Sequence, residues 1–171
     1  MTATFAQQIA LLGCAGLLVW AAVGDIIHFR IANRLSLAVA ALFGAYATAG
    51  WLGGMPVAAL SGLAAGLGVF IAGFLLYSRG LLGGGDVKLF SAVALWSGLD
   101  GLPQLVFIVA LAGGVMALGM VGAKTFSYVR QPASRPAGLP MWRAVLRQPA
   151  PYGVAIAAGG LVSIARLGGL A

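Results

Sequence analysis

The sequence is short of charge, and of acidic residues above all. Its 171 residues include three acids, Asp25, Asp86 and Asp100, and no glutamate. Charged residues make up 8% of the chain, whereas an average soluble domain has about 25%. Hydrophobic residues make up 61%. This composition excludes an ordinary soluble domain and predicts a protein that crosses the lipid bilayer several times.

Cysteine is equally scarce, since Cys14 is the only one and lies inside an apolar run. A disulfide framework and a cysteine-based zinc site are therefore excluded, and we expect neither a metal nor a cofactor.

The net charge of +7 does not predict nucleic-acid binding. The basic residues stand singly at the ends of apolar runs, where anionic lipid head groups would meet them.

The apolar runs predict six membrane spans, because a spanning helix needs roughly 20 apolar residues. Backbone groups in lipid must be paired internally, so each span should be a helix. We expect the spans at residues 5–24, 35–52, 57–77, 87–99, 102–123 and from about 152 onward. The predicted fold is thus an all-α integral membrane protein, a six-helix transmembrane bundle in one domain, 1–171.

The basic residues also predict how this bundle is oriented. With six spans, every lysine and arginine except Arg166 falls on one side of the membrane, and such an excess marks the cytoplasmic side. Both termini should then lie outside, and the loops 25–34, 78–88 and 124–150 should be cytoplasmic. Asp25 and Asp86 would share the inner face, whereas Asp100 would lie in an outer turn, exposed to water.

The predicted fourth span is too short for the bilayer. The eleven residues between Lys88 and Asp100 cover only about 16 Å at 1.5 Å per residue, against a hydrocarbon core of roughly 30 Å. We therefore expect Asp86 in a water-filled notch just inside the membrane, beside a glycine loop that lines a protein cavity.

Two carboxylates at membrane depth suggest a specific chemistry, because ionisable residues there are costly and usually functional. If Asp25 and Asp86 come together from different helices, the pair will hold a single proton. The ionised member can then take a proton from water while the protonated member polarises a peptide carbonyl. Gly83, Gly84 and Gly85 precede Asp86 and can adopt positive φ, so that an extended substrate backbone can approach. Alternatively, they form a flexible connection.

Three segments carry a resemblance to a known family. "GGGDVKLF", with Gly83, Gly85 and Asp86, matches the Gly-x-Gly-Asp signature of type IV prepilin peptidases. "DIIHFRIANRL" resembles that family's first-aspartate segment, with Ala32 where proline is usual, and "PYGVAIAAG" resembles its last span. The resemblance covers nearly the whole chain.

The resemblance implies that the domain 1–171 is an aspartic endopeptidase with Asp25 and Asp86 as its catalytic dyad. It would work at the cytoplasmic face of the bacterial inner membrane and remove the short basic leader of a prepilin or pseudopilin precursor, after a glycine. Larger family members add paired Cys-x-x-Cys motifs and an N-methyltransferase activity. We expect no methylation here, and the short form resembles the peptidases of tight-adherence (Flp-type) pili.

Other residues are assigned supporting roles. Lys88 is expected to reach lipid phosphates, with stabilisation of an ionised Asp86 as the alternative. Asn33 is expected to cap the second span, with side-chain bonds that hold the loop after Asp25 as the alternative. Tyr152 and Gly153 should pack the last span against the site.

Two further features lie at the predicted inner face. His28 is interpreted as an interfacial loop residue. "LPMWRAVLR" is expected to be a short helix on the inner leaflet, and a lid over the site is the alternative.

Other functions stay open from the residues alone. An ion- or proton-coupled transporter would use Asp25 and Asp86 as charge-relay sites, although such acids usually lie near the bilayer midplane. A membrane phosphotransferase would bind Mg²⁺, for which two aspartates are few ligands. A non-catalytic assembly subunit would tolerate loss of both. The oligomeric state is not predicted.

Overall fold

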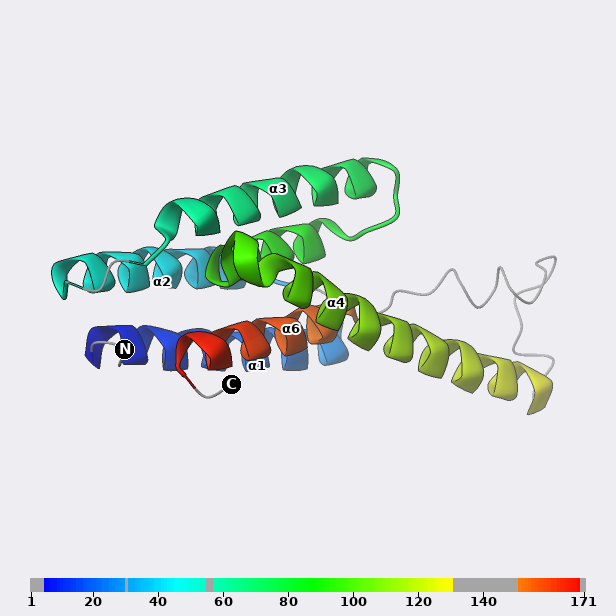
Figure 1. Cartoon of the computed structure of the whole chain (residues 1–171). Helices are drawn as coiled ribbons and strands as arrows, with labels where there is room; N and C mark the ends of the chain where they lie inside the picture. Colours follow the sequence, from blue (N-terminus) through cyan, green and yellow to red (C-terminus); the bar gives the residue numbers. More distant parts are fainter. Residues whose placement is uncertain (1–4, 30, 55–56, 131–150, 170–171) are drawn as a thin grey trace.

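The computed structural model describes residues 5–29, 31–54, 57–130 and 151–169, and every regular element in these ranges is an α-helix (Figure 1). In chain order the helices are α1 (Phe5–His28), α2 (Asn33–Leu52), α3 (Ala59–Ser78), α4 (Gly84–Arg130) and α6 (Tyr152–Leu167). The predicted all-helical class is confirmed for this part of the chain.

Four of the helices are long and apolar enough to cross a membrane: α1, α2, α3 and the stretch Gly84–Ser127 of α4. The apolar helix α6 is shorter, with 16 residues. The outer surface of these helices is apolar. For example, Leu12 is 74% exposed and Leu60 is 81% exposed. In water this surface would be very unfavourable, so the bundle is that of an integral membrane protein. The number of crossings and the side of the termini stay predictions.

Helix α4 contains both segments that the sequence predicts as fourth and fifth spans. It breaks at Gly98, whose φ of 63° and ψ of 178° lie in a region that glycine alone readily adopts. The predicted turn around Asp100 and Gly101 is therefore wrong by a few residues, because both are already helical. Figure 1 shows the two arms pointing in different directions, with the second arm extending past the other helices.

The first arm of α4, residues 84–97, is the centre of the bundle. Helix α4 contacts α2, α3 and α6, while α1 contacts α2 and α6, and α1 and α6 lie side by side in Figure 1. Glycines at these contacts bring the helices close: a Cβ on Gly66 would come within 2.6 Å of the Leu95 side chain. At 1.5 Å per residue the first arm covers roughly 20 Å, which agrees with the short span that the sequence predicts.

Candidate active site

Asp25 lies near the end of α1, where the chain leaves the helix. The helix ends at His28, and Phe29 takes a left-handed conformation with a φ of 51°. Asp25 is nevertheless buried, at 4% exposure. Its Oδ2 accepts a hydrogen bond of 2.7 Å from the backbone N–H of Gly153, in the first turn of α6. The buried carboxylate is therefore oriented by a backbone donor from another helix.

Asp86 lies in the first turn of α4 and is half-buried. Its carboxylate accepts a hydrogen bond from the backbone N–H of Gly83, the residue just before the helix. This is the arrangement of a capping box, in which the third helical residue reaches back to the N-cap. An acid at this end of a helix is also favoured by the helix dipole.

The structure brings Asp25 and Asp86 together from α1 and α4, close enough for a Coulombic interaction between their carboxylates. Ile31, in the connection between α1 and α2, lies close to the first turns of α4 and α6. A Cβ on Gly85 would lie 3.3 Å from the Cβ of Ile31, and a Cβ on Gly153 would lie 2.9 Å from its Cδ1. Ile31 is thus a spacer between the first turns of α4 and α6. Both acids lie at one end of the bundle.

Lys88 and Asn33 join the same end of the bundle. The Lys88 ammonium group donates a hydrogen bond of 3.0 Å to Oδ1 of Asn33, which ties the start of α2 to α4. The interpretation of Asn33 as a helix cap is wrong, because the cap position is occupied by Ala32, without a side-chain hydrogen bond. This hydrogen bond joins Asn33 to α4, and the role of Asn33 in holding the loop after Asp25 stays a prediction.

The three glycines before Asp86 leave space for neighbouring groups. Their role does not depend on unusual backbone angles. None of Gly83, Gly84 and Gly85 has a positive φ, and the last two are already helical. The prediction of a left-handed glycine loop is therefore wrong at these positions. A Cβ on Gly83 would lie 2.5 Å from Oδ2 of Asp86, and one on Gly84 would lie 3.3 Å from the Tyr77 ring. The glycines let the Asp86 carboxylate fold back and let α3 approach.

The remaining predictions for this end have mixed outcomes. Gly153 does pack the last helix against the site, and the Tyr152 ring lies beside Gly113 of α4. His28 is exposed. The segment "LPMWRAVLR" lies outside the described residues, so its role as a lid stays a prediction. Within the described ranges, no three side chains of the metal-ligating types gather in one place.

Two contributions to the site have no clear signal in the sequence. The hydrogen bond from Gly153 joins residues 128 positions apart, and its donor is a backbone group. The spacing role of Ile31 depends on two glycines of distant helices. The "PYGVAIAAG" segment, which contains Gly153, is the part of the sequence that comes nearest to indicating the hydrogen bond to Asp25.

Two neighbouring carboxylates of this kind are suited to acid–base catalysis in which water is activated. Two interacting carboxylates share a proton more readily than both ionise. One can then act as a base while the other donates a hydrogen bond.

Comparison with known proteins gives a consistent set of matches. A model of the type IV leader peptidase family matches residues 12–118, which include both Asp25 and Asp86. Two proteins of Burkholderia pseudomallei, from strains 1026b and K96243, each called prepilin leader peptidase/N-methyltransferase, are 34% identical over 85 residues. The match covers 48% of this chain but only 21% of each relative, so the chain spans about a fifth of their length. No solved structure matches.

Proposed function

Because this chain belongs to the type IV leader peptidase family, we propose that it is a membrane-embedded aspartic endopeptidase that removes the leader peptide from type IV prepilins. The named activity of the Burkholderia relatives supports this substrate class. By its resemblance to the tight-adherence peptidases, the substrate is a prepilin of the Flp type, cleaved at the cytoplasmic face of the bacterial inner membrane.

What supports the proposal is that Asp25 and Asp86 lie at the same end of the bundle, near enough for a Coulombic interaction between their carboxylates. Each carboxylate is held by a backbone N–H, from Gly153 and Gly83 respectively. These hydrogen bonds would orient both carboxylates for catalysis.

In the proposed reaction the pair carries one proton. The ionised carboxylate removes a proton from water, and the resulting hydroxide attacks the carbonyl carbon of the scissile peptide bond. The protonated carboxylate donates its proton to the carbonyl oxygen, which neutralises the charge that develops there. Collapse of the tetrahedral intermediate transfers a proton to the leaving amine and returns the pair to its starting state.

The surface of the bundle suits such a substrate. A prepilin combines a short basic leader with an apolar helix, and the apolar helix can lie against the exposed leucines of the bundle within the bilayer. The leader would then reach the end where Asp25 and Asp86 lie.

The test is co-expression of a Flp-type prepilin with wild type, Asp25→Asn or Asp86→Asn, followed by measurement of precursor and mature pilin. Each substitution keeps the shape of the side chain but removes its acid–base function, so we expect processing to slow by about 10²–10⁴-fold. His28→Ala, which alters an exposed side chain three residues after Asp25, is the control and should process normally. Mature pilin formed at the wild-type rate by either asparagine variant, at equal amounts in the membrane, would refute the proposal.

A further inference from the structure

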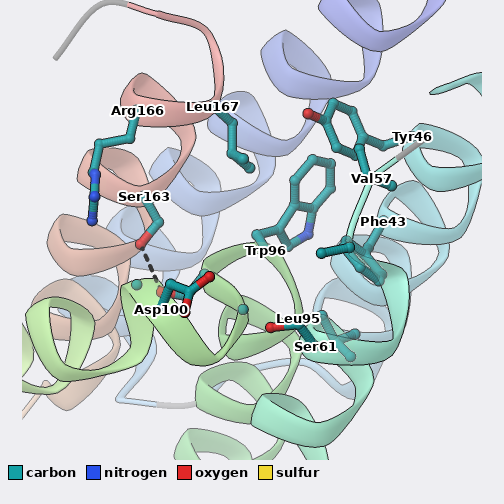
Figure 2. Close-up of a pocket in the computed structure, with 14 residues that line it drawn as sticks. Phe43, Tyr46, Val57, Ser61, Leu95, Trp96, Asp100, Ser163, Arg166 and Leu167 are labelled. Carbon is teal, nitrogen blue, oxygen red and sulfur yellow. Dashed lines mark hydrogen bonds between the residues drawn. The ribbon is translucent and has the colours of Figure 1, made fainter. Parts of the chain in front are cut away.

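A pocket of about 380 Å³ lies at the end of the bundle opposite Asp25 and Asp86 (Figure 2). Its volume falls in the range of small-molecule sites, roughly 300–1,000 Å³. The lining side chains come from α2, α3, α4 and α6 and the residues just before α3, and they include Phe43, Tyr46, Ser61, Trp96, Asp100, Ser163 and Arg166. None of them belongs to the proposed peptidase site.

The walls of this pocket are held in place by specific contacts. Gly98, where α4 breaks, lines the pocket, and the Ser61 hydroxyl accepts a hydrogen bond of 2.8 Å from the Leu99 N–H just after the break. The Trp96 indole N–H donates to the Val39 carbonyl at 3.1 Å. Because the indole is fixed in this way, the pocket exists without a ligand.

Tyr46 supplies a polar group to the wall of the pocket. Its side chain is buried, at 5% exposure, with the ring centroid 5.3 Å from that of Trp96. Its hydroxyl can donate or accept a hydrogen bond, so it can pair with a polar group of a ligand there.

Opposite charges border the same pocket without meeting. Asp100 and Arg166 both line it, but neither forms an ion pair within the described part of the chain. Arg166 donates one hydrogen bond to the side chain of Gln104, which leaves most of its five donors free. Both side chains are exposed, so a ligand that offers a cation to Asp100 and an anion to Arg166 would pair with both.

We propose that this pocket binds a phosphate ester that carries an ammonium group, as the head group of a zwitterionic membrane lipid does. The ammonium group would face Asp100 and the aromatic wall, which attracts cations through its ring faces. The phosphate would pair with the planar guanidinium of Arg166. The acyl chains would follow the outer surface of α3, where Leu60 and Leu63 are 81% and 57% exposed. The bilayer thus supplies the ligand directly.

The test is native mass spectrometry of the purified full chain, titrated separately with phosphatidylethanolamine, phosphatidylglycerol and O-phosphoethanolamine. Phosphatidylglycerol keeps the phosphate but lacks the ammonium group, and O-phosphoethanolamine lacks the acyl chains. We expect one phosphatidylethanolamine per chain, bound at least about tenfold more tightly than phosphatidylglycerol, which corresponds to the loss of one charged contact. Tighter binding of the lipid than of O-phosphoethanolamine would identify the bilayer as the source of the ligand. Tighter binding of O-phosphoethanolamine would contradict a lipid ligand.

Three substitutions address the pocket itself. Asp100→Asn and Arg166→Gln should each weaken phosphatidylethanolamine binding by about tenfold, and Tyr46→Phe, which keeps the ring and its packing, should weaken it severalfold. Arg79→Gln, which removes an exposed cation from the other end of the bundle, should leave it unchanged. Equal binding of the two lipids by wild type, or wild-type binding by the pocket variants, would overturn the proposal. Because Tyr46→Phe removes only an oxygen atom, it stays informative if a charge variant misfolds.

Discussion

At the scale of single residues, Asp25 is placed by a glycine more than by its own helix. Gly153 has no room for a side chain: a Cβ there would lie 2.8 Å from Oδ2 of Asp25 and 2.9 Å from Cδ1 of Ile31. The same residue donates the backbone hydrogen bond to that carboxylate. Its lack of a side chain and its N–H together define where Asp25 lies.

Replacing Gly153 by alanine should therefore impair the proposed reaction more than it impairs folding. The new methyl group must displace Asp25 or Ile31, and a misplacement of about 1 Å in a catalytic group costs on the order of 10²-fold in rate. We expect kcat for prepilin cleavage to fall by about that factor while KM changes little. The measurement is cleavage kinetics in detergent beside a thermal unfolding curve.

Gly160→Ala is the matched control on the same helix. A Cβ at Gly160 would lie 2.8 Å from Cδ1 of Leu18, so this substitution is equally crowded but lies away from the carboxylates. It should lower the unfolding temperature with a much smaller effect on kcat. Similar losses of kcat in both variants would show that Gly153 acts only through packing.

The sequence draws attention to the two aspartates but does not reveal their environment. Scarcity of acids and their place at the ends of apolar runs single out Asp25 and Asp86 without knowledge of the fold. The donor for Asp25 is a backbone N–H 128 positions away, and no local pattern encodes it. Asn33 shows the same limit, since its partner Lys88 comes from another helix and outweighs its local tendency to cap.

At the scale of helices, the break in α4 determines where the centre of the bundle ends. With a φ of 63° and a ψ of 178°, Gly98 occupies a conformation that is essentially closed to other residues. The chain changes direction there, and Ser61 of α3 compensates by accepting the Leu99 N–H. Without the break, the two arms of α4 would form one straight helix and lose contact with α3 or α6.

Gly98→Ala should therefore destabilise the bundle, by roughly 1–3 kcal/mol for a residue forced into such a conformation. Gly68→Ala is the control, because Gly68 is helical and a Cβ added to it would meet only open space. That substitution should be neutral or stabilise by about 0.5–1 kcal/mol. The check is reversible unfolding in mixed micelles for both variants. A Gly98→Ala protein as stable as Gly68→Ala would show that the break is not required.

The starts of the helices agree with the sequence better than their ends do, because α1 runs to His28, four residues past the predicted end of the first span. The starts of α2 and α6 follow polar or proline-containing segments and lie within two residues of their predicted places. In α4, Asp100, Gly101 and Pro103 are the usual turn residues, yet all three are helical. Gly98 takes the turn instead because its contact with Ser61, a residue of another helix, decides the position.

At the scale of the whole molecule, charge is distributed unequally between the two ends of an apolar bundle. In the described part of the chain, the end with Asp25 and Asp86 also holds Arg34, Arg79 and Lys88. The opposite end holds Asp100 and Arg166. This asymmetry supports an orientation in which the carboxylate pair faces the cytoplasm, where prepilins are made.

Cysteine labelling tests that orientation directly, because Cys14 is fully buried and gives little background. Leu52→Cys marks the exposed end of α2 away from the carboxylates, and Arg79→Cys marks the exposed end of α3 beside them. In spheroplasts, a membrane-impermeant maleimide should label position 52 at once and position 79 only after lysis. The opposite pattern would place Asp25 and Asp86 outside the cell, out of reach of a cytoplasmic leader peptide. Labelling of both positions before lysis would mean that α2 or α3 does not span the bilayer. The predicted crossings would then not explain why Asp25 and Asp86 share one membrane face.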